Sequence, residues 1–151
     1  MLEPGTPVPP LDLEDTAGRA VDLGGHAVLL YFMRSTTCPV CRHHVRDLAA
    51  NAEPLAADGV RVVIAVPEDR ETAAAWRAKH DVPFPVVTGR HGTPHEAVGL
   101  GKAVFGALQR SGSVLVDADG IVRHAHSATL PTGSYDKAGI AAAVAALRTR
   151  A

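Results

Sequence analysis

Continuous apolar runs alternate with helical patterns through the middle of the chain. Residues 27–32 and 60–66 are apolar almost throughout and have the length of buried strands. Each run is followed by a stretch with the apolar spacing of one helix face. Strands of this kind, separated by helices, are typical of parallel pairing inside a sheet that is covered on both faces. The pattern therefore predicts an α/β fold with a central sheet flanked by helices.

Three helices are expected from the spacing. Pro39 opens the first, because its missing N–H costs nothing in a first helical turn. The second begins at Glu68 and Asp69 and extends to about His80, and an Ala-rich helix at residues 136–148 closes the chain. The buried face of the first helix is predicted to consist of Cys41, Val45, Leu48, Ala52 and Leu55.

Shorter alternating segments predict hairpins near both ends of the chain. Residues 11–13 and 20–23 flank a turn at Gly18 and predict an N-terminal β-hairpin. Residues 113–116 and 121–126 flank an Asp-Ala-Asp-Gly turn and predict a second hairpin. Since hairpins pair antiparallel, the central sheet is expected to be mixed.

The remaining segments complete one domain. Residues 84–87 are expected to form a third strand after Pro83, residues 88–108 to hold short helical turns, and the Pro-rich residues 1–10 to form an extended arm. At 151 residues and 46% hydrophobic, the chain has enough apolar material for one normal core. We therefore expect a single domain over residues 1–151.

Charge and hydropathy exclude several classes of partner. The chain holds 15 Lys and Arg against 16 Asp and Glu, which leaves no electrostatic footprint for nucleic acid or an anionic membrane surface. No apolar run approaches the length of a membrane span, and the first residues do not resemble a signal peptide. The sequence therefore predicts a cytoplasmic protein that binds neither nucleic acid nor membrane.

The only two cysteines, Cys38 and Cys41, lie between the first apolar run and the first helix. A strand that delivers two thiols to the first turn of a helix is typical of a reactive dithiol. Unpaired backbone N–H groups and the positive end of the helix dipole favour the thiolate of Cys38 over its thiol. In a reducing compartment, a close pair is more often catalytic or metal-binding than a permanent disulfide.

The charges near the pair are one-sided. Residues 31–46 contain no acid, and their basic residues are Arg34, Arg42, His43, His44 and Arg46. Arg42 lies one helical turn beyond Cys38, and helical side chains lean toward the N-terminus, so its guanidinium could reach the thiolate. A solvated surface position remains the alternative for Arg42 and Arg46, because it is the usual place for basic helix residues.

With these features, residues 11–147 resemble the thioredoxin-like superfamily and, within it, the peroxiredoxin branch, also called the alkyl hydroperoxide reductase and thiol-specific antioxidant family. The resemblance rests on the N-terminal hairpin and on four segments: LLYF before the cysteines, VIAVPE before a helix, PFPVV, and VLVDADG at the end of an apolar strand. It implies a thioredoxin-like fold and a thiol peroxidase that needs no cofactor and no metal.

The resemblance also implies roles for individual residues. Cys38 would attack a peroxide oxygen and become a sulfenic acid, and Cys41 would resolve it as an intramolecular disulfide. Ser35 stands where the family places a hydroxyl residue that helps to hold the peroxide, together with the backbone around Thr36 and Thr37. An external dithiol, such as a thioredoxin-like protein, would reduce the disulfide; a homodimer stays open.

The chain departs from the family pattern in its proline and its arginine. Tyr31 replaces a proline expected before the cysteines, and the catalytic arginine would fall on Ser111, one position after Arg110. A bulge at Gly112 could re-aim Arg110 toward the site. Arg42 is the competing cation.

Three other readings of the Cys pair remain open. A thioredoxin-like disulfide oxidoreductase would carry Trp in place of Thr37, a buried acid in place of Phe32 and a cis-proline in place of Gly112. A metal site could use Cys38 and Cys41 with His43 or His44, although zinc usually takes four ligands. A redox-sensing module without turnover is the third. The pairs His91 with His95 and His124 with His126 have spacings compatible with ligands but are read as surface histidines.

Overall fold

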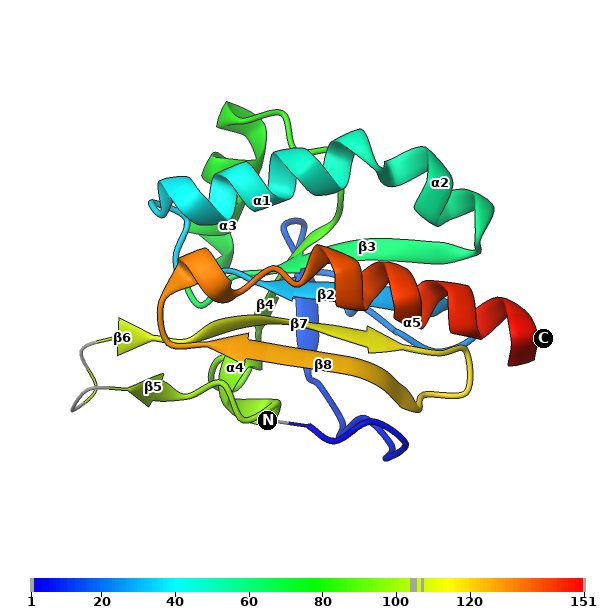
Figure 1. The fold of residues 1–151 in the computed structure, drawn as a ribbon. Helices are drawn as coiled ribbons and strands as arrows, with labels where there is room; N and C mark the ends of the chain where they lie inside the picture. Colours follow the sequence, from blue (N-terminus) through cyan, green and yellow to red (C-terminus); the bar gives the residue numbers. More distant parts are fainter. Residues whose placement is uncertain (1, 104–105, 107, 151) are drawn as a thin grey trace.

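The computed structural model describes residues 2–103, 106 and 108–150. Six strands form one sheet in the order β1-β4-β3-β2-β7-β8 (Figure 1). The strands are β1 (Leu13–Asp15), β2 (Ala27–Phe32), β3 (Val60–Ala65), β4 (Val86–Gly89), β7 (Ser111–Val116) and β8 (Val122–Ala128). The helices are α1 (Pro39–Ala50), α2 (Ala52–Ala57), α3 (Arg70–Lys79), α4 (Pro94–Ala97), the 3-10 turn η1 (Pro131–Gly133) and α5 (Lys137–Arg150).

The pairing of the central strands confirms the predicted mixed sheet. β2 and β3 run parallel over their whole length, from Ala27 opposite Val60 to Phe32 opposite Ala65. β7 pairs antiparallel with the other edge of β2, and β8 pairs antiparallel with β7. The carboxyl end of β2 and the beginning of β7 therefore meet at one end of the sheet, which is the end where the cysteines follow.

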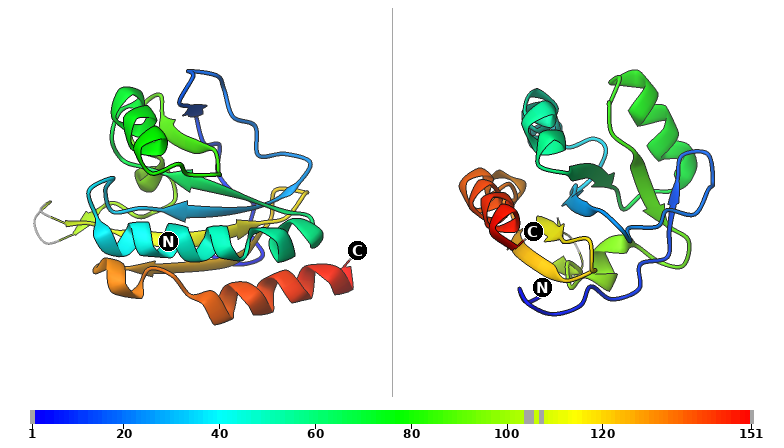
Figure 2. Two further views of the ribbon diagram at one scale, coloured as in Figure 1. Left: turned by 90° about the horizontal axis from the view of Figure 1, so that it is seen from above. Right: turned by 90° about the vertical axis from the view of Figure 1, so that its right-hand side faces the viewer.

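Both faces of the sheet are covered, which explains why the central strands are continuously apolar. Leu29 and Tyr31 of β2 belong to the core under α1, α3 and α5. Val28, Leu30 and Phe32 belong to the opposite core, against the N-terminal arm and the segment after α4. The ribbons agree: α1, α2, α3 and α5 lie on one side of the sheet, and the arm and α4 on the other (Figures 1 and 2).

The predicted long helix after Pro39 is two helices. α1 ends at Ala50, and Asn51 leaves helical geometry at φ −104° and ψ 11° before α2 begins. Pro54 lacks the N–H that would bond to the carbonyl four residues earlier, and its ring crowds that carbonyl. The Asn51 amide donates to the Asp47 carbonyl oxygen at 2.8 Å. The break therefore follows from two residues that compete with a continuous helix.

The N-terminal turn forms, but its second arm is short. Gly18 adopts φ +81° and donates to the Asp15 carbonyl at 3.0 Å. Only one bridge, Glu14 to Ala20, joins the two arms. The main partner of β1 is β4, with which it pairs antiparallel over all three of its residues.

Two other segments differ from expectation. The third strand begins at Val86 rather than residue 84. Within residues 88–108, where only helical turns were predicted, α4 is followed by a two-stranded ribbon of β5 (Lys102–Ala103) and β6 (Leu108–Gln109). Residues 104, 105 and 107 lie outside the described residues. No helix in the described part of the chain has the length and apolar character needed to cross a membrane.

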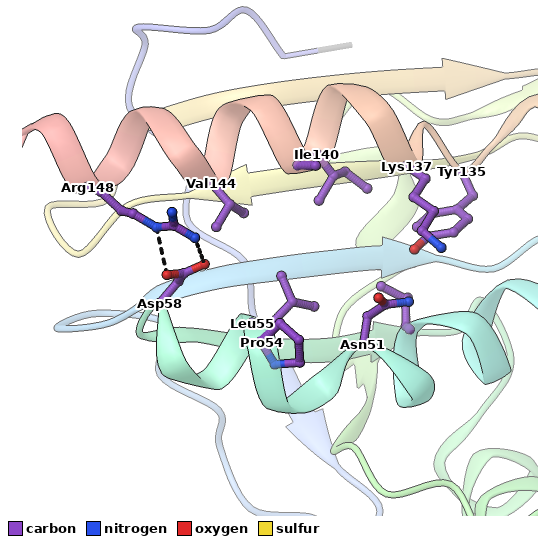
Figure 3. A pocket seen from close by; sticks show the side chains of 11 residues that line it. Asn51, Pro54, Leu55, Asp58, Tyr135, Lys137, Ile140, Val144 and Arg148 are labelled. Carbon is purple, nitrogen blue, oxygen red and sulfur yellow. Dashed lines mark hydrogen bonds and ion pairs between the residues drawn. The ribbon is translucent and has the colours of Figure 1, made fainter.

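A hollow of about 230 Å³ lies between α2 and α5, away from the cysteines (Figure 3). Leu55, Ile140 and Val144 line it, and Arg148 closes one end by donating to both carboxylate oxygens of Asp58 at 2.8 and 2.7 Å. This ion pair ties the end of α5 to the residue that ends α2. The hollow contains none of the predicted site residues.

Candidate active site

The structure places Cys38 at the tip of α1, as the sequence predicts. Cys38 is the N-cap residue, with extended backbone at φ −77° and ψ 112°, and Pro39 follows in the first turn. Its Sγ accepts a hydrogen bond from the Cys41 backbone N–H at 3.2 Å. The thiol therefore satisfies one of the N–H groups that a helix start leaves unpaired.

The two thiols have different surroundings. Both are free and buried, but Cys38 lines a cleft of about 590 Å³, whereas Cys41 is 0% exposed. Burial, reinforced by a hydrogen bond to Cys38, raises the pKa of Cys41 to about 12. The Arg34 backbone N–H donates to Cys41 Sγ at 3.4 Å. Cys38 is thus the thiol that a substrate in the cleft meets first.

The loop before Cys38 carries the predicted hydroxyl residues. The Ser35 and Thr37 hydroxyls hydrogen-bond to each other at 3.1 Å, and the Cys38 N–H donates to the Ser35 carbonyl at 3.3 Å. Thr36 and Thr37 line the cleft. Ser35 is half-buried beside them and is not one of the lining residues.

Glu68 is a residue that the sequence did not single out for the site. Its Oε2 accepts both the backbone N–H of Thr36 at 2.9 Å and the Thr36 hydroxyl at 2.6 Å. Two charge-assisted bonds of this kind fix the loop ahead of α1 to the segment ahead of α3. In the sequence, Glu68 indicates a helix start and ends the VIAVPE segment, but no local signal places its carboxylate beside Thr36. Both Thr36 donors are consequently engaged within the protein.

The structure separates the two candidate arginines. Arg42 lines the cleft with Cys38, and its Nε is buried without a hydrogen-bond partner among the described residues. Arg110 is exposed and is not one of the residues that line the cleft. The predicted bulge at Gly112 is wrong: this residue pairs in register with Phe32 and Ser127, and the irregularity lies between Leu115 and Val116.

Position 112 requires glycine for a reason other than a bulge. A Cβ at this position would lie 2.2 Å from the backbone oxygen of His126, so the close approach of β8 requires glycine. Ser111, where the family pattern expects the arginine, is fully buried at the start of β7. Nothing in this regular pairing turns Arg110 toward the cysteines.

The far wall of the cleft comes from α3. Trp76 is 5% exposed and lines the cleft, and its indole Nε1 is buried without a partner in the described residues. Lys79 and His80 contribute basic groups to the same wall. Sequence reasoning placed Trp76 in a helix but gave it no role, because only the fold brings α3 to the tip of α1.

A polar cluster adjoins Cys41 inside the core. The Tyr31 hydroxyl lies 2.8 Å from His44 Nδ1 and 2.9 Å from Ser134 Oγ, and all three residues are buried. Burial and nearby His43 lower the pKa of His44. From the sequence, Tyr31 was expected only to replace the family's proline, and His44 to be a basic neighbour of the cysteines or, alternatively, a metal ligand.

The other histidines contact protein groups. His91 pairs with Asp12, His124 lies 3.7 Å from Asp136, and His126 Nε2 hydrogen-bonds to the Gly133 carbonyl. Within the described ranges, no three His, Cys, Asp or Glu side chains are grouped as a metal site. His95 is not a surface residue as expected: it is 0% exposed, and its Nε2 donates to the Met33 carbonyl at 2.6 Å.

His95 should make stability depend on pH. Burial lowers its pKa from 6.5 to about 4, so the folded protein holds it neutral while the unfolded chain binds a proton below pH 6.5. This contribution is complete above pH 6.5 and is lost as the pH falls toward 4, by about 3 kcal/mol. Denaturant unfolding of the wild type and of His95→Asn at pH 7 and pH 4 measures it.

The expected difference is a pH dependence that is smaller by about 3 kcal/mol in His95→Asn than in the wild type. The exposed His26 offers a matched control, because His26→Asn should keep the full pH dependence. The same pH dependence in wild type and His95→Asn would contradict the assignment.

Comparison with known proteins agrees with this geometry. The family model described as "AhpC/TSA family" matches residues 4–125. Chloroplastic peroxiredoxin Q from Sedum lineare is 25% identical over 122 residues, which are 79% of this chain and 66% of that protein. Chloroplastic peroxiredoxin Q from Suaeda salsa is 24% identical over 79% of this chain and 57% of its own length. The chain thus spans less than two thirds of these curated relatives.

Solved structures show the same fold. Peroxidoxin BcpB from Mycobacterium tuberculosis superposes with a TM-score of 0.80 at 19% identity, covering 99% of this chain and 98% of that one. Reduced Prx3 from Vibrio vulnificus superposes with a TM-score of 0.78 at 20% identity, covering 98% and 99%. The predicted thioredoxin-like fold is confirmed by this likeness. Because the family model covers most of the chain, the chain belongs to the AhpC/TSA family, the peroxiredoxin branch of the thioredoxin-like superfamily.

Proposed function

We propose that this chain is a thiol peroxidase that reduces hydrogen peroxide or organic hydroperoxides through Cys38. The observation that carries the proposal is the position of Cys38 Sγ, capped by a helix N–H at 3.2 Å and facing a cleft, with Cys41 one turn behind it. A helix start stabilises negative charge that lies close to it, and a thiolate is the nucleophile of peroxide reduction. Family membership supports the same chemistry.

The oxidation of the two thiols by peroxide proceeds in two steps. The Cys38 thiolate attacks one peroxide oxygen, the O–O bond breaks, and the other oxygen leaves as water or an alcohol after taking up a proton. Cys41 sulfur then attacks the Cys38 sulfenic acid, the S–O bond breaks, and water leaves. The product is a redox-active Cys38–Cys41 disulfide. An external dithiol, such as a thioredoxin-like protein, restores both thiols by exchange.

The cleft supplies the remaining groups. Arg42 offers a preorganised positive charge to the oxygen that leaves, where negative charge grows as the O–O bond breaks. Ser35 and Thr37, linked through their hydroxyls, hold the loop beside the attacked oxygen. Thr36 contributes by fixing this loop to Glu68. Arg110 has no part in this proposal, because it lies outside the cleft.

The size of the cleft bears on the substrate. A water molecule occupies about 30 Å³ in the liquid, so a cleft of about 590 Å³ has room for far more than hydrogen peroxide. The Trp76 and Ala75 side chains give part of its wall an apolar surface. We therefore include organic hydroperoxides in the proposed substrate range.

The proposed cycle also suggests a location and partners. The disulfide has to return to two thiols after each turnover, which favours a reducing compartment and hence the cytoplasm. The chemistry of the described residues calls for no cofactor. A homodimer stays a prediction.

Turnover of three substrates tests the proposal. Reduced protein should consume hydrogen peroxide and cumene hydroperoxide rapidly, forming one disulfide for each peroxide consumed. With a protein disulfide such as that of insulin, the rate of reduction in the presence of the protein should be close to the rate with the dithiol alone. Protein with alkylated thiols is the control. Rapid insulin reduction with slow peroxide consumption would instead favour a thiol-disulfide oxidoreductase, and no turnover at all a redox-sensing module.

A further inference from the structure

The polar cluster beside Cys41 joins three segments that lie far apart in the sequence. Tyr31 comes from β2, His44 from α1, and Ser134 from the turn between η1 and α5. The Tyr31 hydroxyl lies 2.8 Å from His44 Nδ1 and 2.9 Å from Ser134 Oγ, and Ser134 Oγ lies 3.4 Å from the same nitrogen. Three polar groups converge on one another in an otherwise apolar core. Such a buried network is costly unless it is satisfied or used.

The cluster reaches the resolving thiol. Tyr31 and Cys41 belong to the same buried core, and the Tyr31 hydroxyl lowers the pKa of Cys41 against the opposing effect of burial. Cys41 and His44 lie one turn apart on the buried side of α1, which brings both toward the Tyr31 side of the core. The Arg34 backbone N–H donates to Cys41 Sγ at 3.4 Å.

Cys41 has to carry negative charge without hydration. It is 0% exposed, and burial raises its pKa to about 12, so water contributes nothing to stabilising its thiolate. Yet charge develops on this sulfur in both halves of the proposed cycle. A preorganised donor in a water-excluded site is worth much more than the same donor in water.

We propose that the Tyr31 hydroxyl is a catalytic hydrogen-bond donor to Cys41 as its thiolate forms, and that His44 and Ser134 are positioning residues for that hydroxyl. The inference rests on the proposed function, because it assigns Cys41 the resolving role. In this proposal Tyr31 acts on the reacting sulfur, and His44 and Ser134 act through their hydrogen bonds to Tyr31. Ser113 in turn holds the Ser134 backbone by donating from its hydroxyl to the carbonyl at 3.2 Å.

The donor acts twice in each cycle. When the disulfide forms, the S–S bond replaces the S–O bond, and the Cys41 proton leaves with the oxygen as water while Tyr31 donates to the sulfur. When the external dithiol attacks Cys38, the S–S bond breaks and Cys41 leaves with the electron pair. The proton that Cys41 then takes up comes from the second thiol of the dithiol, which closes its own disulfide. A thiol of high pKa is a poor leaving group, so the donor accelerates this half as well.

The charged surroundings of the cluster come from several elements. Cys38 and Tyr31 are the titratable neighbours of Cys41. His44 faces His43 and Asp47 on its own helix and the ring of Tyr135, whose centroid is 5.2 Å away. Tyr135 donates its hydroxyl to Asp47 at 2.8 Å, and Lys137 donates to the same carboxylate at 3.2 Å. Tyr135 is therefore a second phenol beside His44, and its hydroxyl bonds to Asp47.

Tyr31→Phe is the direct test, with Tyr135→Phe as the matched control. The two halves of peroxide oxidation are followed separately by trapping the Cys38 sulfenic acid with a 1,3-diketone and by quenching for disulfide content. In Tyr31→Phe, sulfenic acid formation should stay within about twofold of the wild type, and disulfide formation should slow at least tenfold. The pH profile of disulfide formation should move to higher pH. Tyr135→Phe should leave both rates unchanged.

The positioning role is tested at His44. His44→Leu removes the partner of the Tyr31 hydroxyl and should slow disulfide formation several-fold. His44→Asn keeps a polar atom near the Nδ1 position and should restore most of the rate. Equal slowing by Leu and Asn would assign His44 a packing role and overturn its part in the inference. These variants also decide the matter if Tyr31→Phe fails to fold.

The inference and the proposed function fail in distinguishable ways. If wild-type protein forms no sulfenic acid with any peroxide, the proposed function is wrong. The donor role is then tested on the disulfide formed with diamide, whose reduction by dithiothreitol should still be at least tenfold slower in Tyr31→Phe. Wild-type rates of disulfide formation or reduction in Tyr31→Phe overturn the inference.

Discussion

Cys38→Ser should abolish the reaction with peroxide, whereas Cys41→Ser should react once and then stop. Cys38 faces the cleft and caps α1, while Cys41 is fully buried with its pKa raised to about 12. Without Cys38, no thiol lines the cleft in which the peroxide would bind. Without Cys41, the sulfenic acid forms but has no internal thiol to condense with.

Rapid mixing with one equivalent of hydrogen peroxide measures this difference. Peroxide consumption by Cys38→Ser should fall to the uncatalysed rate, which is a loss of several orders of magnitude. Cys41→Ser should consume one equivalent and accumulate sulfenic acid or a mixed disulfide, detected by its mass. Alkylation of the wild type supplies an independent check, since equal rates for both thiols at neutral pH would refute unequal roles.

Arg42→Ala should slow peroxide reduction by about a hundredfold. A preorganised cation beside the oxygen that leaves contributes a few kcal/mol to the transition state, and each 1.36 kcal/mol is tenfold in rate. Arg42 lines the cleft with Cys38. Its substitution should also slow alkylation of Cys38 by neutral iodoacetamide, but less, because only the charge near the thiolate is lost there.

Arg110→Ala is the matched control, since it removes the same side chain at an exposed position outside the cleft. We expect wild-type rates for both reactions in this variant. If Arg110→Ala slows peroxide reduction tenfold and Arg42→Ala does not, the cation comes from the strand side instead. If neither variant is slow, disulfide exchange becomes the stronger hypothesis for the site.

The elements that follow from local pattern were predictable from the sequence. β2 and β3 are buried on both faces except at Arg61, so nearly continuous apolar runs identified them. Pro39 marks the start of α1. The Asp69 side chain caps α3 by accepting the Thr72 N–H at 2.8 Å. These signals lie within a few residues of the element they specify, and tertiary contacts reinforce rather than oppose them.

Other parts of the fold depend on contacts that no local pattern contains. β1 pairs with β4, more than 70 residues along the chain, so its short hairpin was overestimated. The break between α1 and α2 had a local signal in Pro54, but the apolar stripe continued across it and outweighed it.

The candidate site divides in the same way. Cys38, Cys41 and Arg42 lie within two helical turns, so their proximity could be predicted from their spacing in the sequence. Cys38 and Arg42 line the same cleft. Trp76 and Glu68 join them only because β3 runs parallel to β2 and returns the chain to the same end of the sheet. Arg110 was a candidate because it lies next to the position of the family's arginine, but the structure leaves it exposed outside the cleft.

The hydrogen bond from the Cys41 N–H to Cys38 Sγ reflects how close the two cysteines lie, and this closeness should protect Cys38 from over-oxidation. Cys38 and Cys41 lie within a single helical turn, so the proposed disulfide would form at a very high effective concentration of the second thiol. A sulfenic acid that is captured this quickly has little time to meet a second peroxide. Irreversible conversion to sulfinic acid should therefore be slow, and the protein should stay active through bursts of oxidant that inactivate enzymes with distant resolving thiols.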